Sequence, residues 1–262
     1  MIKEQQRFAD SNLFEGMVSI RAVLESQHQP HNDRRITELY YAEERTHSHA
    51  KEYAWLTHRA EEFGFSITVL PMAELDDMAI GNTHGGVLAL CSNRTLPCLT
   101  EDNVHTLPEN GFFVMLEGIE DPYNFGYAMR SLYAAGADAV ILSERNWMRA
   151  AGVVCRASAG ASERFALYTA ANGTDAAALL RKHGCRVICA DMDNSVAMYD
   201  TALTRPLFLV VGGEKRGISR ALLSMADAVV RLDYGREFPG ALSAASAASI
   251  LAFEVYRQNR DL

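Results

Sequence analysis

Short runs of hydrophobic residues alternate with stretches of helical spacing in the second half of the chain. The runs predict strands at residues 112–116, 139–142, 165–169, 186–190, 207–212 and 229–232, and the stretches predict helices at 127–135, 175–183, 219–225 and 241–256. Strands that are hydrophobic on both faces and separated by helices are typical of a parallel sheet covered on both sides. We therefore predict an α/β fold for this half.

A shorter α/β pattern comes first. It predicts helices at 16–26 and 47–63 and strands at 36–42, 66–70 and 86–91. Residues 91–111 then contain two prolines, many turn-forming residues and no sustained periodicity, which indicates a linker. We predict a small α/β domain with its linker at 1–105 and a larger α/β domain at 106–262.

Composition narrows the class of protein. The 262 residues are 48% hydrophobic and 22% charged, which excludes disordered and fibrous proteins. No hydrophobic run approaches the ~20 residues of a membrane span, and the first residues lack the apolar core of a signal peptide. The five cysteines are odd in number and never spaced C-x-x-C, as in proteins with reduced thiols. We expect a cytoplasmic protein that does not associate with membranes.

The net charge of −8 argues against non-specific binding to nucleic acid, which needs clustered lysine and arginine. The excess of acid lies mainly in the first 105 residues, with 9 basic and 16 acidic side chains; the remainder holds 16 and 17. The basic residues of the second half are mostly arginine, whose fork suits phosphate and carboxylate. Phosphate contact by the second half stays open.

Loops after parallel strands are where such sheets bind ligands. In the first of three such loops, Asp121 and Pro122 end the strand, and Asn124 and Gly126 suit a turn or a helix cap. Arg130 follows in the next helix. An arginine and an asparagine at a helix start can hold a phosphate and a hydroxyl, but a capped turn with a solvent-facing arginine explains the pattern equally well.

The second loop, residues 212–219, reads GGEKRGIS. Its glycines let a ligand approach the backbone closely, and Glu214 offers a carboxylate beside them. Its spacing is not that of a P-loop, because Lys215 precedes Gly217 and no Ser or Thr follows the lysine. An ordinary turn between strand and helix remains the alternative.

The third region, residues 235–249, is rich in alanine and serine and leads into the last predicted helix. Small residues allow close packing of the backbone against a ligand. They allow close packing against another helix equally well.

Other candidate sites are weaker. Ser158 misses the first glycine of the G-x-S-x-G nucleophile motif. His47 and His49 are predicted to lie on different faces of a helix, so a metal site is not expected. Asp191 and Asp193 could bind a cation, although one acidic loop is usually only solvated.

Taken in order, the three loops resemble the signature motifs of the SpoU (TrmH-like) branch of the SPOUT methyltransferases. The first motif is matched by Asp121, Pro122, Asn124, Gly126 and Arg130, and the second by Gly212, Glu214, Gly217, Ile218 and Ser219. The S-A-G-A segment at 158–161 and the H-G-G-V phrase at 84–87 are also similar to the family. The resemblance covers nearly the whole chain.

This resemblance implies transfer of a methyl group from S-adenosylmethionine to a ribose 2′-hydroxyl of tRNA or rRNA. It implies a SPOUT domain with a carboxyl-terminal trefoil knot, an exception to the rule against threaded chains, and a homodimer whose two knotted domains build each cofactor site. The front domain resembles a small RNA substrate-binding domain. The expected cofactor-binding residues are Gly212, Gly213, Glu214, Gly217, Val230, Leu232, Ala241, Leu242 and Ser243.

The expected catalytic residues are Arg130, Asn124, Glu214 and Ser243. A guanidinium with a pKa above ~12 is a poor base, so we expect Arg130 to bind a phosphate and stabilise alkoxide charge, with Asn124 orienting it. Glu214 is expected to hold an arginine or to shape the cofactor loop. The third motif departs from the family, because Ala241-Leu242-Ser243 stands in place of S-L-N and Asp233 in place of proline.

Three alternatives remain. A SPOUT relative could methylate a base instead of a ribose, although Asn124 and Arg130 favour ribose. A catalytically weak or silent RNA-binding or assembly factor is favoured by the altered third motif and the acidic front domain. A nucleotide-dependent dehydrogenase is disfavoured because no G-x-G-x-x-G follows a strand.

Overall fold

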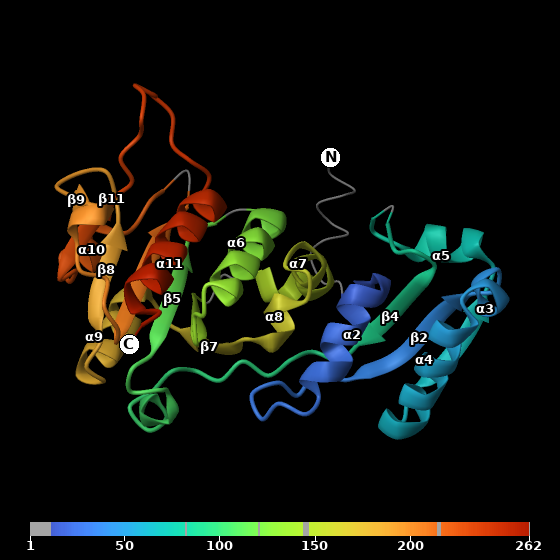
Figure 1. The fold of residues 1–262 in the computed structure, drawn as a ribbon. Helices are drawn as coiled ribbons and strands as arrows, with labels where there is room; N and C mark the ends of the chain where they lie inside the picture. The colour runs from blue at the N-terminus through green and yellow to red at the C-terminus, as the bar shows by residue number, and fades with distance from the viewer. Residues whose placement is uncertain (1–11, 82, 120, 144–146, 214–215, 262) are drawn as a thin grey trace. The chain divides into compact units, whose positions relative to one another are not determined.

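The computed structural model of the chain describes residues 12–81, 83–119, 121–143, 147–213 and 216–261 (Figure 1). These residues form two compact units. Unit 1 holds the described residues up to Thr95 and the segment Trp147–Arg164, and unit 2 holds those of Leu96–Asn146 and Phe165–Leu262. The bounds differ from the predicted division at residue 105, and whether either part is an independent domain stays a prediction.

Unit 1 contains a four-stranded sheet with the order β1-β4-β2-β3. Strands β2 and β3 are parallel, whereas β4 pairs antiparallel with β1 and with β2. Its elements are β1 (Leu13–Glu15), α2 (Gly16–Ser26), β2 (Ile36–Ala42), α3 (Arg45–Ser48), α4 (Ala50–Phe63), β3 (Ser66–Leu70), α5 (Met72–Met78), β4 (Val87–Cys91), α7 (Ala151–Ala157) and α8 (Ala161–Arg164). The helix predicted at 47–63 is interrupted at His49, whose backbone leaves helical geometry (φ −123°, ψ 41°).

The segment Trp147–Arg164 belongs to unit 1 although it lies between two strands of unit 2 in sequence. Gly152 packs against β1, where an added Cβ atom would stand 1.9 Å from the Leu13 carbonyl oxygen. The fully buried Glu163 carboxylate pairs with the buried Arg34 guanidinium, with 2.9 Å between Nε and Oε2. Because a buried charge is costly without a partner, this ion pair ties the segment to unit 1.

Unit 2 contains a seven-stranded sheet with the order β7-β6-β5-β10-β8-β11-β9, and every pair in it is parallel. The strands are β5 (Phe112–Glu117), β6 (Ala139–Ser143), β7 (Ala166–Ala170), β8 (Arg186–Ala190), β9 (Val196–Ala197), β10 (Leu207–Gly212) and β11 (Ala228–Arg231). All side chains at 112–116 and 207–211 are buried. The prediction of a parallel sheet covered on both faces is confirmed.

Helices cover the sheet of unit 2 (Figure 1). They are α6 (Pro122–Ala134), α9 (Gly173–Lys182), α10 (Arg220–Leu223) and α11 (Ala244–Asn259). Helices α6 and α11 pack against each other, and α11 also contacts β10. Side chains of α9 and α10 pack with alternate residues of β5, β8 and β10 in one hydrophobic cluster.

Part of the predicted linker is ordered along the edge of this sheet. The Thr169 N–H donates to the Pro97 carbonyl, and the Leu99 N–H donates to the Thr169 carbonyl, each at 2.8 Å. Leu99 and Leu107 are buried in the hydrophobic cluster of unit 2. Residues 96–107 therefore pack with unit 2 because their backbone and two leucines find partners there.

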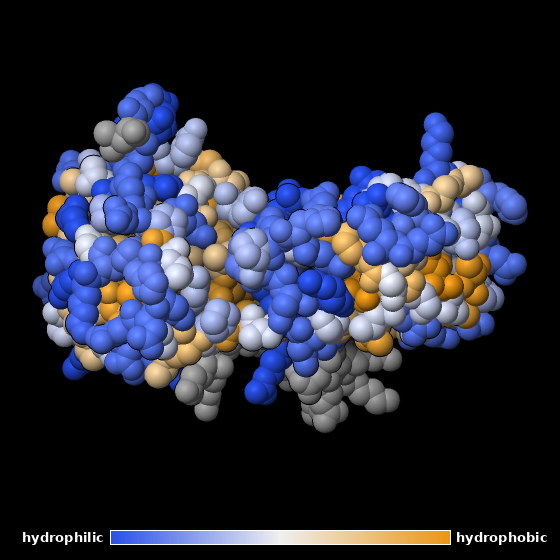
Figure 2. Space-filling model, turned by 90° about the horizontal axis from the view of Figure 1, so that it is seen from below, coloured by the Kyte–Doolittle hydropathy of each residue, from blue (hydrophilic) through white to orange (hydrophobic). Residues whose placement is uncertain are grey.

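No helix among the described residues is long and apolar enough to cross a membrane. One face of the surface, drawn in Figure 2, is mostly hydrophilic with smaller hydrophobic patches between. The five cysteines are free, and all except Cys98 are buried. Burial raises the pKa of Cys185 and of Cys189 to about 12, so both thiols are neutral at physiological pH.

Candidate active site

The loop after β10 is closed by contacts that need glycine. The Gly213 N–H donates to the Glu117 carbonyl at the end of β5, at 2.6 Å. A Cβ atom on Gly213 would lie 2.1 Å from the Gly118 carbonyl oxygen, well inside normal contact. Gly213 also forms an antiparallel bridge with Gly217, whose φ of +60° is left-handed. The first and second loops are therefore joined backbone to backbone.

The far end of this loop is fixed as well. Ile218 is buried in the hydrophobic cluster of unit 2, and the Ser219 N–H faces Glu117 Oε2 at 3.4 Å. Glu214, a predicted catalytic and cofactor-binding residue, lies outside the described residues. The described residues of the loop, 212–213 and 216–219, lie close around the carboxyl end of β10.

A pocket of about 200 Å³ opens at the carboxyl ends of β8, β10 and β11. In the described part of the chain it is lined by Ala190, Asp191, Met192, Val211, Gly212, Gly213, Gly217, Val230, Arg231, Leu232, Tyr234, Ala241, Leu242, Ala244, Ala247 and Leu251. Seven of these are predicted cofactor-binding residues, namely Gly212, Gly213, Gly217, Val230, Leu232, Ala241 and Leu242. The structure thus brings the second and third loops together.

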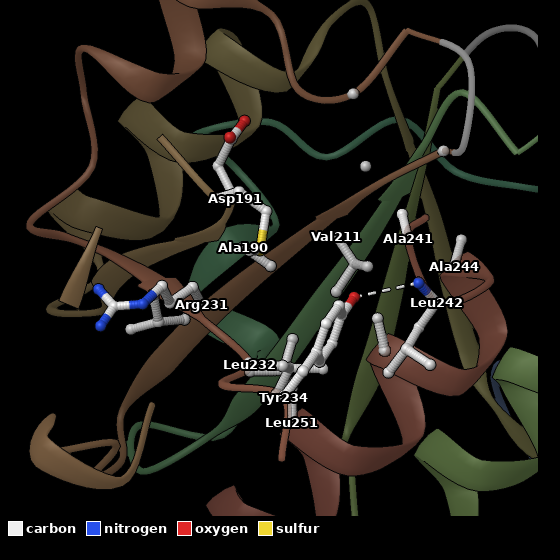
Figure 3. A pocket seen from close by; sticks show the side chains of 16 residues that line it. Ala190, Asp191, Val211, Arg231, Leu232, Tyr234, Ala241, Leu242, Ala244 and Leu251 are labelled. Atoms are coloured by element: carbon white, nitrogen blue, oxygen red, sulfur yellow. Dashed lines mark hydrogen bonds between the residues drawn. The ribbon is translucent and has the colours of Figure 1, made fainter. Parts of the chain in front are cut away.

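Tyr234 shapes this pocket and was not predicted. Its Oη accepts a hydrogen bond from the Leu242 N–H at 3.2 Å, drawn as the dashed line in Figure 3. The contact closes the irregular segment 232–243 across the pocket. In Figure 3, Asp191 and Arg231 lie on one side, Ala241 and Ala244 on the other, and the Tyr234 ring stands between.

Among the described residues, two charged side chains line the pocket. Arg231 is engaged, because its Nε lies 2.8 Å from Asp233 Oδ1 and its Nη1 donates to the Ser195 carbonyl at 2.6 Å. Asp191 follows β8 directly, and its Oδ1 accepts from the Asp193 N–H at 3.1 Å. A mostly apolar pocket with one carboxylate at its edge suits a flat ring attached to hydroxyl groups or to a positive charge.

The place of Asp191 in the pocket could have been predicted from the sequence. Asp191 directly follows the predicted strand at 186–190, and the carboxyl ends of parallel strands share one edge of the sheet, where ligands bind. No sequence pattern indicates the hydrogen bond between Tyr234 and Leu242, because an irregular loop has no periodicity. Asp191 and Asp193, which the sequence analysis treated as an acidic loop that is usually only solvated, belong to no cluster of three or more metal-ligating side chains among the described residues.

Ser243 does not line the pocket in the described structure. It is the N-cap of α11, where its hydroxyl oxygen faces the Ser246 N–H at 3.2 Å and the Ser246 hydroxyl at 3.0 Å. This cap explains why the helix predicted from residue 241 begins at Ala244. Its hydroxyl is directed to the helix start.

Arg130 and Asn124 are carried by α6. Asp121 caps the helix by accepting from the Asn124 N–H at 3.0 Å, and Pro122 occupies the first turn. The helix therefore begins five residues before the predicted Tyr127. Arg130 is exposed and does not line the pocket described above. None of the described residues that line the pocket belongs to the first motif.

Ser158 has a structural role. It is buried, donates to the Cys155 carbonyl at 3.1 Å and accepts from the Ser162 N–H at 3.1 Å. A hydroxyl held in this way between two short helices is not a nucleophile at a pocket. This structural role agrees with the sequence analysis, which gave Ser158 little weight as a nucleophile.

Known proteins resemble this chain over most of its length. The 23S rRNA (guanosine-2′-O-)-methyltransferase RlmB of Shewanella oneidensis is 26% identical over 248 residues, 94% of this chain and 96% of that protein. An uncharacterized tRNA/rRNA methyltransferase of Mycolicibacterium paratuberculosis is 32% identical over 205 residues, 77% of this chain and 65% of that protein.

Solved structures show the same fold. An RNA 2′-O ribose methyltransferase superposes with a TM-score of 0.78 at 22% identity, covering 100% of this chain and 96% of that one. An AdoMet-bound rRNA methyltransferase from Sinorhizobium meliloti has a TM-score of 0.76 at 21% identity, covering 94% and 86%. The model of the SpoU rRNA Methylase family matches residues 111–253, more than half of the sequence. The chain belongs to the SpoU rRNA methylase family.

Proposed function

We propose that this chain transfers the methyl group of S-adenosylmethionine to a ribose 2′-hydroxyl of tRNA or rRNA. The observation that carries the proposal is the pocket at the carboxyl ends of β8, β10 and β11, where the second and third family motifs meet. The names of two relatives support ribose as the acceptor: RlmB is a guanosine-2′-O-methyltransferase, and the structure with the TM-score of 0.78 is a 2′-O ribose methyltransferase.

The residues of the pocket fit this cofactor. Leu232, Leu242 and Leu251 offer apolar walls for the adenine ring, and the glycine rim allows close approach of backbone groups. Asp191 offers a carboxylate for the ribose hydroxyls or the amino group. When bound, S-adenosylmethionine supplies a methyl group on a sulfonium ion. The chain's part is to hold this group in line with the ribose oxygen, and positioning of this kind supplies much of the acceleration.

Arg130 acts on the RNA in this proposal. Its guanidinium binds a phosphate next to the target ribose and stabilises negative charge developing on the 2′ oxygen. Asn124 and the capped start of α6 orient it. Because Arg130 lies outside the pocket of its own chain, the proposal requires a second chain to bring an Arg130 to each pocket.

The surface of unit 2 supports a homodimer. Exposed apolar or aromatic side chains lie on two helices that pack against each other: Tyr127 and Tyr133 on α6, and Ile250, Phe253 and Tyr256 on α11. The spacing of three residues on α11 gives this helix a second apolar stripe, opposite its buried one. Such a face is a good candidate for self-association. The carboxyl-terminal knot, and RNA binding by the front part of the chain, belong to the same proposal.

The third motif favours a second candidate, a catalytically weak or silent RNA-binding factor. Ser243 caps α11, and Ala241 has no polar side chain. We expect slow transfer that rises when Ser243→Asn is combined with Ala241→Ser, because an amide reaches further than a hydroxyl and offers both a donor and an acceptor. If this double variant folds, binds the cofactor and still transfers nothing, the silent factor is the better reading.

The test is transfer of labelled methyl groups from S-adenosylmethionine to RNA from a strain lacking the gene. A 2′-O-methyl group blocks alkaline cleavage of the adjoining phosphodiester, so alkali-resistant dinucleotides distinguish ribose from base methylation. Arg130→Ala should abolish transfer and leave cofactor affinity intact. The matched control is Arg260→Ala, an exposed arginine at the end of α11. Label recovered only in bases would refute the ribose assignment.

A further inference from the structure

A second, open pocket of about 430 Å³ lies beside the first and shares Leu232, Tyr234 and Leu242 with it. Its remaining lining residues are Tyr199, Asp233, Gly235, Arg236, Phe238 and Ile250. Most of them lie in segment 232–243, where the sequence departs from the third family motif. Tyr234, with Leu232 and Leu242, therefore forms the wall between the proposed cofactor pocket and the second pocket.

Aromatic rings stand open to solvent around this hollow. Tyr199, from the turn after β9, is 65% exposed, and Phe238 is 57% exposed. The ring centroids of Tyr234 and Phe238 are 5.9 Å apart and the rings are tilted by 58°, so they do not stack face to face. Exposed ring faces of this kind are platforms on which the bases of unpaired RNA stack.

The charge at the rim suits a phosphate. The Asp233 carboxylate is already neutralised by Arg231, with 2.8 Å between Oδ1 and Nε. Arg236 forms no ion pair in the part of the chain that the structure describes. A guanidinium beside open rings matches the two chemical parts of a nucleotide, an aromatic base and a phosphate.

We propose that this second pocket binds an unpaired nucleotide of the RNA substrate, with its base on Phe238 and Tyr199 and its phosphate on Arg236. The inference rests on the proposed function, because the shared wall at Tyr234 puts such a nucleotide next to the methyl donor. A second copy of the chain is a less suitable occupant: of the exposed α6 and α11 side chains, Ile250 alone also lines this pocket in the described structure.

The test uses two conservative variants. Phe238→Leu keeps an apolar side chain and removes the ring, and Arg236→Gln removes the charge; Arg260→Gln is the matched control. Each protein is measured for binding to a single-stranded RNA 12-mer containing 5-bromouridine, for KM toward total RNA from the deletion strain, for S-adenosylmethionine affinity by calorimetry, and for mass by light scattering. Photocrosslinks to the 12-mer are mapped by mass spectrometry.

We expect Phe238→Leu to weaken RNA binding and raise KM roughly 5- to 150-fold, the range for losing one base–aromatic stack. Cofactor affinity and mass should stay unchanged, and crosslinks should fall in segment 232–243 or at Tyr199. Unchanged RNA binding in both variants would overturn the proposal, as would a shift from dimer to monomer, which would assign the pocket to a second chain. Crosslinks in this segment without any methyl transfer would refute the proposed function and keep the site.

Discussion

Gly213 is the position where one added carbon atom tests the geometry of the site. In Gly213→Ala, the new Cβ atom would stand 2.1 Å from the Gly118 carbonyl oxygen, 2.4 Å from its carbon and 2.9 Å from the Ile119 nitrogen. All three are backbone atoms and cannot rotate away. The loops after β5 and β10 must therefore separate by about 1 Å or more to reach van der Waals contact.

The cost has two parts. Forcing a methyl group into a packed contact costs about 1–3 kcal/mol. Separating the loops also breaks the hydrogen bond from Gly213 N to Glu117 O, a net loss of about 1 kcal/mol. Together these lower the free energy of unfolding by about 2–4 kcal/mol, which for a chain of this size corresponds to about 4–16 °C in Tm.

The measurements are thermal unfolding followed by calorimetric titration with S-adenosylmethionine. If the loop after β10 yields instead of the whole unit, the same strain lowers cofactor affinity, because Gly212 and Gly217 line the pocket. Gly235→Ala is the control: nothing lies within 4 Å of its added Cβ atom, so both quantities should match those of the natural protein. A Gly213→Ala protein with unchanged Tm and unchanged cofactor affinity would refute this reasoning.

Three further changes test other parts of the site and its helices. Tyr234→Phe removes the acceptor of the Leu242 N–H and should weaken S-adenosylmethionine binding about 5-fold by calorimetry, as for one lost hydrogen bond. Phe253→Glu puts a charge on the exposed stripe of α11, and light scattering should then show a monomer of 28.9 kDa. The hydrogen bond from Arg257 holds the pKa of Glu254 below its usual value. Glu254 therefore adds stability above pH ~4.5 that is lost as the pH falls through its lowered pKa, so Glu254→Gln should reduce Tm at pH 7 and lose this difference in acid.

The local pattern of hydrophobic residues was sufficient to predict the elements whose residues are all buried. Residues 112–116 and 207–211 are apolar without interruption, and both are central strands buried on both faces. Helix starts were less well predicted, because capping overrides periodicity: Asp121 begins α6 early, and Ser243 begins α11 late. The Asp-Pro pair was predicted to end the strand, but β5 already ends at Glu117, and the pair instead starts α6.

The candidate site was predicted in part, since its glycines and small residues mark places where backbone must approach closely. The ring of Tyr234 was missed because its partner is a backbone amide eight residues away in an irregular loop. The sequence analysis also missed that Trp147–Arg164 belongs to unit 1, for a related reason. The pairing of Arg34 with Glu163 joins residues 129 positions apart, and no local pattern encodes a contact over that distance.

The excursion of Trp147–Arg164 into unit 1 limits how this protein can be cut and recombined. A truncation that removes residues 1–105 also removes Arg34 and Asn32, both hydrogen-bonded to the buried Glu163 carboxylate. The same truncation removes β1 and α2, against which α7 and α8 pack, so residues 147–164 lose their ion pair and their buried surface together. Residues 1–105 therefore cannot be exchanged as a unit by a single cut in the chain. Any exchange of the front part must include residues 147–164, because they belong to the same compact unit.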